Sequence, residues 1–406
     1  RDLQIPGVKK IIITEKAPEE QASGHTPSDE GAGRDAASDS QPDRPTAADI
    51  IRKAPGLAAA DLLANLKSKG WAPDLVISQP SGGMTLHIKD VFPGVPFLGF
   101  FDWYHNPDRL METFSPDGNE PALKDRIALR NKNLPILADL VSADACICGS
   151  QWQKSQFPRE FHAKLSVVHP GVDLGRFKAD ETAVFKTERL DLSGAGALIT
   201  YTAGLLAPYN GFEPFLGALP KVLEKKPDTH VVIMGADQVS LADREGNKKS
   251  YKETLLEKTA LPEDRVHFVE RLDFEAYLSL LQASSLHVYL DSPLVLNRFL
   301  LEAMACECLV MAPAIPPVKE VIRDGSNGIL FDFSSSEAIA KKILNCLDMP
   351  SFTKDLRKKA RQTMEEGYSF EQSLNQQTGI IKALMDKGQG LERAREDNGA
   401  DTSQFG

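Results

Sequence analysis

The chain has 406 residues, of which 42% are hydrophobic and 26% charged, and its formal net charge is −10. That length is enough for two domains with a core each, and the composition is ordinary for a globular protein. The acidic balance counts against binding to phosphate backbones, so we expect no nucleic-acid partner. No window of the sequence approaches the ~20 apolar residues that a membrane-spanning helix needs.

Five cysteines occur, as Cys146-x-Cys148, Cys306-x-Cys308 and Cys346. The odd count and the C-x-C spacing fit neither a disulfide framework nor a zinc site. All five lie in apolar runs, which predicts small buried thiols in a reducing compartment. The expected location is therefore the cytoplasm.

The chain opens on a predicted strand at residues 5–14. Residues 15–46 contain almost no large apolar residue, so burial cannot offset their ordering entropy and we expect a disordered insertion. An amphipathic helix is predicted at residues 47–69. Strands and helices then alternate, which predicts parallel βαβ units. The strands are expected at residues 75–78, 96–101, 145–148 and 165–169, and the helices at 122–141 and 151–161.

The second half repeats the alternation after a polar stretch. Its strands are expected at residues 197–203, 230–235, 266–268, 286–290 and 308–311, and its helices at 212–225, 274–283, 298–306, 335–347, 351–366 and 370–385. The predicted organisation is an N-terminal domain at 47–180, a linker at 181–196, a C-terminal domain at 197–368, a C-terminal helix at 369–388 and a disordered tail at 389–406. Ligands of such parallel sheets bind beyond the carboxyl ends of the strands.

Residues 292–333, SPLVLNRFLLEAMACECLVMAPAIPPVKEVIRDGSNGILFDF, place the acidic Glu302 inside an otherwise apolar helix. Burying an unpaired carboxylate costs roughly several kcal/mol of folding free energy, so we expect Glu302 to have a functional role. The segment resembles the donor-binding core of family-4 retaining glycosyltransferases of the GT-B fold. Five further segments support that resemblance, and the last two resemble a bacterial-type subgroup: ITYTAGLLAPYNGFEPFLGALPKVLEKKPDTHVVIMG, VHFVERLDFEAYLSLLQASSLHVYLD, SVVHPGVDLGRF, GFFDWYHN and SQWQKSQFPREF.

The resemblance implies an α/β GT-B fold, in which two Rossmann-like, doubly wound domains face a central cleft. It also implies a nucleotide-sugar site on the C-terminal domain, to which eight residues are assigned: Glu302, Glu320, Arg298, Asn297, Gly204, Asn210, Arg271 and Leu272. Glu302 matches the family residue that accepts hydrogen bonds from the ribose hydroxyls, and the turn at residues 270–272 matches the one that holds the base. A carboxylate can accept two hydroxyl donors at once.

The sequence departs from the family at three places. The family usually has a second Glu eight positions before the ribose Glu, and here that position is Leu294. Its basic diphosphate-binding residues correspond to Gly204 and Asn210. The start of the helix after Asn297 must then hold the phosphates, with Arg298 as a substitute cation or as a plain solvent-facing residue. Finally, the first strand of the N-terminal domain is expected to be missing from the chain.

The acceptor side is predicted on the N-terminal domain. Six residues are assigned to it: Gly82, Gly83, Asp102, Trp103, Tyr104 and His105. The glycine pair lies in a loop after a strand, where a substrate can approach closely. Asp102 and His105 are the predicted catalytic acid/base residues, and an acid, two aromatics and a His suit sugar contact, with plain packing as the open alternative.

The predicted function is that of a retaining glycosyltransferase of the hexosyltransferase type. No metal is expected because no D-x-D motif ends a strand, and no cofactor is expected because the nucleotide-sugar is a substrate. The acceptor is a carbohydrate, a lipid-linked molecule or a protein, and membrane association and oligomeric state stay open. The main alternative is a weakened homologue that binds a nucleotide or a partner without catalysis; an epimerase on the same fold ranks last.

Overall fold

The computed structural model describes residues 56–80, 83–106, 122–237, 249–290, 295–332 and 335–400. Two compact units are present: residues 1–73 with 81–93, and residues 74–80 with 94–406. The predicted strand at 5–14 and the predicted disordered insertion at 15–46 lie outside the described residues, as do Gly82, Leu294 and residues 401–406.

The smaller unit contains the helices α2 (Leu57–Ser68) and α3 (Ile88–Val91). The described part of the predicted helix at 47–69 is confirmed. Gly56 precedes α2 with φ +80°, and a Cβ at this position would clash with the backbone oxygen of Gly83. Glycine is therefore required where the chain enters the helix.

The first sheet of the larger unit has four parallel strands in the order β1-β2-β3-β4. These strands are β1 (Val76–Ser78), β2 (Phe97–Phe100), β3 (Ala145–Cys148) and β4 (Leu165–Val167), with the helices α5 (Leu123–Ser142) and α6 (Gln151–Gln156). The helix predicted at 151–161 is too long. It breaks because the residue before Pro158 adopts an extended conformation, and a short 3-10 helix η1 (Arg159–Phe161) follows.

The second sheet has six parallel strands in the order β10-β9-β8-β5-β6-β7. They are β5 (Ala197–Leu205), β6 (Thr229–Ala236), β7 (Val266–Val269), β8 (Leu286–Val288), β9 (Val310–Pro313) and β10 (Ile329–Phe331). A short 3-10 helix η2 (Pro208–Asn210) follows β5. The sequence prediction missed β10, because its three residues directly follow a Gly-bounded turn and are too few to show a period.

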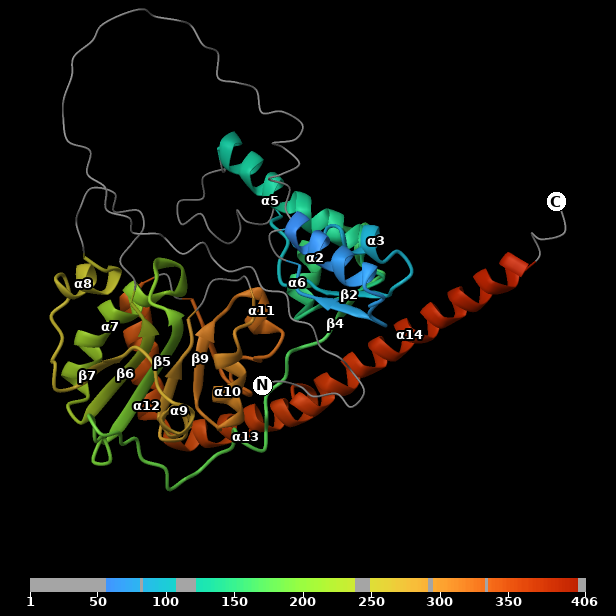
Figure 1. Cartoon of the computed structure of the whole chain (residues 1–406). Helices are drawn as coiled ribbons and strands as arrows, with labels where there is room; N and C mark the ends of the chain where they lie inside the picture. Colours follow the sequence, from blue (N-terminus) through green and yellow to red (C-terminus); the bar gives the residue numbers. More distant parts are fainter. Residues whose placement is uncertain are drawn as a thin grey trace, which may run out of the picture. The chain divides into compact units, whose positions relative to one another are not determined.

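Helices cover both faces of this sheet (Figure 1). They are α7 (Phe212–Lys225), α8 (Tyr251–Leu256), α9 (Phe274–Gln282), α10 (Arg298–Ala305), α11 (Pro316–Lys319), α12 (Ser336–Asp348) and α13 (Pro350–Gly367). In β9, Met311 belongs to the core with α7 and α12, while Val310 and Ala312 belong to the core with α10 and α13. Successive side chains of the strand thus point to opposite faces of the sheet and pack into two cores, as a doubly wound fold requires. The short α8 and α11 were not predicted.

The last helix returns to the first sheet. It is α14 (Phe370–Ala400), the long red helix after α13 in Figure 1, and its Leu384 packs with Leu98, Ile147 and Val168. We expected this helix to end near residue 388 and a disordered tail to follow, but it continues to Ala400. Residues 391–396 are Leu, Glu, Arg, Ala, Arg and Glu, all good helix formers, which accounts for the extension.

Two further expectations concern the linker and the cysteines. The linker at 181–196 is not a bare connection, because Phe185 and Leu192 are buried in a core with Leu198, Val232 and Leu280. All five cysteines are free and buried, as predicted. In the described ranges, no helix combines the length and the apolar character needed to cross a bilayer.

The second sheet also buries a histidine. His287 in β8 is fully buried, with its Nδ1 2.9 Å from Thr200 Oγ1, and Thr200 in turn lies 2.7 Å from Ser284 Oγ. Burial lowers the pKa of His287 from 6.5 to about 3. The imidazole is therefore neutral in the folded protein at neutral pH.

This pKa predicts acid sensitivity. Between pH 6.5 and about 3 the unfolded chain binds a proton at His287 and the folded chain does not. As the pH is lowered through this window, this group alone should reduce the free energy of unfolding by about 1.4 kcal/mol for each pH unit. Denaturant titrations across the window should show a shallower decline for His287→Asn. An equal decline in the two proteins would contradict the assignment.

Candidate active site

Most of the predicted donor residues follow the carboxyl ends of strands in the second sheet. Gly204 is the second-last residue of β5, Arg271 follows β7, Asn297 follows β8 and Glu320 follows β9. Because all these strands are parallel, their carboxyl ends lie at one edge of the sheet, which is where ligands of such sheets bind.

Glu302 is buried in α10, with 7% of its surface exposed. Its Oε2 accepts a hydrogen bond of 2.7 Å from the Tyr277 hydroxyl, and its Oε1 lies 3.5 Å from Arg298 Nε. Burial raises the pKa of the Glu302 carboxyl, while the Tyr277 hydrogen bond and the Arg298 charge lower it. A carboxylate offers about four acceptor positions, so this one keeps capacity for further hydroxyl donors.

The sequence did not reveal Tyr277 as the partner of Glu302. It lies in α9, and burial raises the pKa of its hydroxyl well above the usual value, so it acts as a neutral donor. A signal was present, since Tyr277 is a hydroxyl-bearing side chain among the apolar residues Leu280 and Leu281 of its helix. Pairing it with Glu302 requires knowledge of how α9 and α10 pack.

The start of α10 combines a cap and an exposed cation. Asn297 caps the helix, because its Oδ1 accepts a hydrogen bond of 3.2 Å from the Phe299 amide. The Arg298 side chain is 73% exposed and pairs with Glu302 one turn later. This exposure fits both expectations for Arg298, a cation for the phosphates and a solvent-facing residue, and the structure adds an intramolecular partner.

The loop after β5 offers no cation. Gly204 is exposed, and nothing lies within 4 Å of the position of an added Cβ. Asn210 is buried, and its side chain accepts a bond of 3.1 Å from the Ala207 amide and donates to the Leu205 carbonyl. The amide of Asn210 is thus used inside its own loop, which gives it a structural role there.

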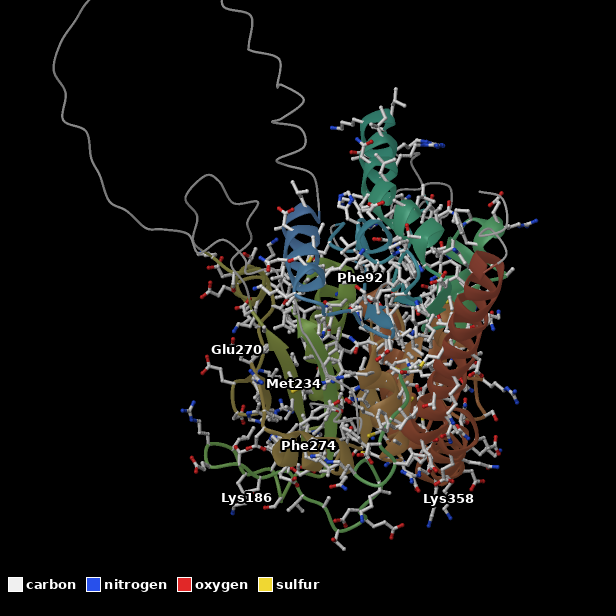
Figure 2. All side chains as sticks on the ribbon, turned by 45° about the vertical axis from the view of Figure 1, so that its right-hand side comes forward. Phe92, Lys186, Met234, Glu270, Phe274 and Lys358 are labelled. Carbon is white, nitrogen blue, oxygen red and sulfur yellow. The ribbon has the colours of Figure 1, made fainter. Side chains whose placement is uncertain are left out.

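The turn after β7 runs from Glu270 to the start of α9 at Phe274, and Figure 2 labels both residues. Glu270 and Arg271 are exposed, whereas Leu272 is half-buried against the cores beneath. Phe274 starts α9 and is covered by the Arg176 guanidinium at 3.5 Å from its ring centroid. Arg271 is therefore available for a ligand, while Leu272 helps to anchor the turn.

The segment after β2 is held by three elements of the first sheet's layer. Asp102 is exposed, its carboxylate accepts a bond from Gln79, and its carbonyl accepts one of 2.6 Å from Gln153. The backbone of His105 exchanges two bonds, of 2.9 and 2.8 Å, with the Asn133 side chain of α5. The loop is thus fixed in place by residues that the sequence did not single out.

The side chains of this segment differ in their surroundings. Burial, followed by the Lys132 charge, lowers the pKa of His105, which favours a neutral imidazole. Burial raises the pKa of Tyr104, whose ring lies 5.7 Å from that of Phe157. The Trp103 Nε1 is buried without a hydrogen-bond partner in the described structure. Gly83 belongs to the smaller unit and has φ +85°, a conformation suited to glycine.

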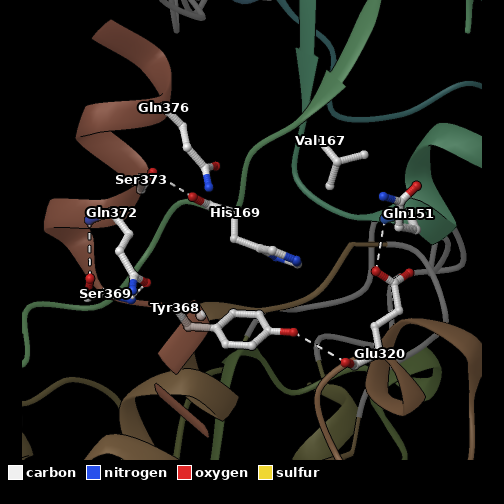
Figure 3. Close-up of a pocket in the computed structure, with 10 residues that line it drawn as sticks. Gln151, Val167, His169, Glu320, Tyr368, Ser369, Gln372, Ser373 and Gln376 are labelled. Atoms are coloured by element: carbon white, nitrogen blue, oxygen red, sulfur yellow. Dashed lines mark hydrogen bonds between the residues drawn. The ribbon is translucent and has the colours of Figure 1, made fainter. Parts of the chain in front are cut away.

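Glu320 bonds to the start of a helix beside the first sheet. It follows α11, and its carboxylate accepts hydrogen bonds from the Gln151 amide at 2.9 Å and from the Trp152 amide, at the start of α6 (Figure 3). The Tyr368 hydroxyl donates to the Glu320 carbonyl at 3.2 Å. Both carboxylate oxygens are thus engaged by the layer of the first sheet, so Glu320 connects the two sheets where a free ligand contact was predicted.

No three His, Cys, Asp or Glu side chains form a cluster suited to a metal ion within the described ranges. The donor and acceptor candidates are therefore polar groups without a shared metal-binding geometry.

Two family models match the chain. Residues 35–177 match the model described as Glycosyl transferase family 4 group, and residues 192–363 match Glycosyl transferases group 1.

Among curated proteins, the chain is similar to an uncharacterized glycosyltransferase of Methanocaldococcus jannaschii, with 26% identity over 45% of this chain and 44% of the relative. It is also similar to the D-inositol 3-phosphate glycosyltransferase of Streptomyces scabiei, with 26% identity over 52% of this chain and 47% of the relative. Spore coat protein SA of Bacillus subtilis is 27% identical over 53% of this chain and 58% of the relative. The chain matches about half the length of these relatives.

Solved structures show the same fold. Anabaena HepE in complex with UDP and glucose is similar with a TM-score of 0.62 and 17% identity, over 79% of this chain and 81% of that one. Sucrose-phosphate synthase from Thermosynechococcus elongatus is similar with a TM-score of 0.63 and 16% identity, over 84% and 80%. The fold is GT-B, with two Rossmann-like domains, as predicted.

Replacing Glu320 should weaken the connection between the two sheets. In Glu320→Ala the first amides of α6 lose a charged acceptor, which should cost about 1.5–3 kcal/mol of unfolding free energy. Glu320→Gln keeps one acceptor oxygen and should cost less. Urea titration measures the loss, and faster hydrogen exchange at the Gln151 and Trp152 amides localises it.

The exposed Glu366→Ala serves as the control, with little expected effect on either readout. Wild-type exchange rates at both amides in Glu320→Ala would show that the carboxylate does not hold α6.

Proposed function

We propose that this chain, which belongs to the glycosyltransferases through a family 4 group domain and a group 1 domain, transfers a sugar from a nucleotide-sugar donor to an acceptor. The observation that carries the proposal is the buried Glu302 carboxylate in α10, the helix that follows β8, with acceptor capacity left over. The UDP and glucose in the HepE structure support a nucleotide-hexose donor.

Glu302 receives the ribose hydroxyls of the donor. Tyr277 and Arg298 occupy part of the carboxylate and hold its geometry before the ligand arrives. Such preorganisation lowers the cost of ordering the site on binding. The exposed Arg271, after β7, is the neighbouring group that faces the base.

The diphosphate is held by the start of α10. The helix is eight residues long, and its first amides and the exposed Arg298 guanidinium supply the positive end. Since neither Gly204 nor Asn210 adds a cation, we expect weaker binding of the diphosphate than a site with two further basic residues would give.

Transfer proceeds with retention and without a metal ion. The bond between the anomeric carbon and the donor phosphate oxygen breaks, the acceptor oxygen bonds to the same face, and the acceptor proton passes to the leaving phosphate. Asp102 and the neutral His105 accept hydrogen bonds from the acceptor and orient its hydroxyl. Five free thiols support a reducing compartment such as the cytoplasm.

A second function is favoured by the missing cations. A protein that binds a nucleotide without transferring sugar would need Glu302 but not a strong diphosphate site. Titration calorimetry with UDP, GDP and ADP, together with a hydrolysis assay on the matching nucleotide-sugars, separates the two. Binding without hydrolysis or transfer favours the second function, and binding of none of the nucleotides excludes both.

Glu302→Gln should weaken nucleotide binding. The substitution removes the charge that strengthens hydrogen bonds from hydroxyls, so the Kd for the bound nucleotide should rise roughly 10- to 100-fold. Calorimetry measures this change. Glu307→Gln, just after the same helix, is the matched control and should bind like the wild type. Equal affinity of Glu302→Gln and wild type would remove the central support of the proposal.

Gly204→Arg should strengthen binding. The position is exposed and open, so the new guanidinium can reach the carboxyl edge of the sheet without steric cost. A charge-assisted contact to the diphosphate should lower the Kd about tenfold. The neutral Gly204→Gln is the control, and the gain should shrink in high salt. Loss of affinity, or an equal gain with Gln, would contradict a diphosphate at this position.

A further inference from the structure

A cavity of about 380 Å³ lies beside Glu320, within the larger unit (Figure 3). It is bounded by the start of α6, the end of β4, the residue after α11, the end of α13 and the first turns of α14. This volume is within the range of about 300–1,000 Å³ for small-molecule pockets. Neither Glu302 nor Arg298 lines it, so it is separate from the proposed nucleotide site.

The walls of the cavity offer no positive charge. No Lys or Arg is among the lining residues. His169 is the one basic group, and burial lowers its pKa to about 4, so it is neutral near pH 7. The Glu320 carboxylate is already bonded to two amides of α6. No lysine or arginine side chain would therefore face a phosphate or another anion here.

Three neutral polar groups face the space. The side chains of Gln151, His169 and Gln376 come from α6, the end of β4 and α14, and Figure 3 shows them around one volume. His169 Nδ1 is buried and has no hydrogen-bond partner in the described structure. A buried polar atom of this kind costs about 1–3 kcal/mol unless a ligand or water satisfies it.

The rest of the lining is already satisfied and rigid. Ser369 and Gln372 cap the start of α14 reciprocally, at 3.1 and 3.4 Å, and the Ser373 hydroxyl donates to the His169 carbonyl at 2.6 Å. The Tyr368 ring lies 4.7 Å from the His169 ring and forms a flat wall. The Gln151 and Gln376 amides, a neutral imidazole and an aromatic wall together match a compact ligand with many hydroxyl groups.

We propose that this cavity binds an uncharged, hydroxyl-rich ligand, a monosaccharide or a cyclic polyol. Gln151 and Gln376 each offer a donor and an acceptor to its hydroxyls, and the His169 imidazole lines the same space. Because the ligand site connects segments of both sheets beside Glu320, occupancy also stabilises the connection between α6 and α11. The proposal does not depend on the transferase activity.

The test uses the full chain and titration calorimetry with D-glucose, myo-inositol and inorganic phosphate. The wild type should bind glucose or inositol and should not bind phosphate at the cavity. Gln376→Leu and His169→Phe keep the approximate shape and each remove hydrogen bonds, so each should weaken polyol binding roughly two- to tenfold. Gln362→Leu, at an exposed glutamine of α13, is the matched control and should leave binding unchanged.

Three results would overturn the proposal. The first is that neither polyol binds to the wild type. The second is that Glu302→Gln abolishes polyol binding while Gln376→Leu leaves it unchanged. The third is that phosphate binds and that Gln376→Leu weakens this binding. UDP titrations on the same variants separate this site from the proposed function, because the cavity variants should bind UDP like the wild type. If UDP binds neither the wild type nor any of the variants, that result counts against the proposed transferase function and not against the proposed polyol site.

Discussion

The contact between Glu320 and the start of α6 is the constraint on which the arrangement of the larger unit depends. A carboxylate that follows β9 of the second sheet accepts from the first amides of a helix that follows β3 of the first sheet. The positive end of a helix and a carboxylate attract each other, and such charge-assisted bonds are stronger than neutral ones. Tyr368 fixes the same segment from the side of α14.

Parallel topology explains why residues far apart in sequence converge on two sites. Every described strand of both sheets is parallel to its neighbours, so the segments after the strands gather at one edge of each sheet. Glu302 is the exception, because it lies inside α10 and is buried. Tyr277 and Arg298 keep its charge compatible with burial, and a buried carboxylate with two partners is already oriented for a third.

Much of the fold could be predicted from the sequence, and less of the site. Strands such as β6, with Val231, Val232 and Ile233 at its centre, contain a continuous apolar run. Such runs are typical of parallel strands that are buried on both faces. The short β10 and α11 carry too few residues to show a period. The burial of Glu302 was readable from its apolar helix. The partners of Glu302 and Glu320 were not, because Tyr277 and Gln151 lie 25 and 169 residues away and only packing brings them close.

Arg298 couples the two halves of nucleotide recognition in the proposed site. In the free protein its guanidinium faces the Glu302 carboxylate at 3.5 Å while most of the side chain remains in solvent. The arginine is mostly in solvent, so it can change partners once another donor satisfies the buried Glu302 carboxylate. Ribose hydroxyls that bond to Glu302 replace part of what Arg298 supplies, and the cation is then free to turn toward a diphosphate at the helix start. Without cations at Gly204 and Asn210, a single arginine must serve both groups, so ribose and phosphate binding depend on each other.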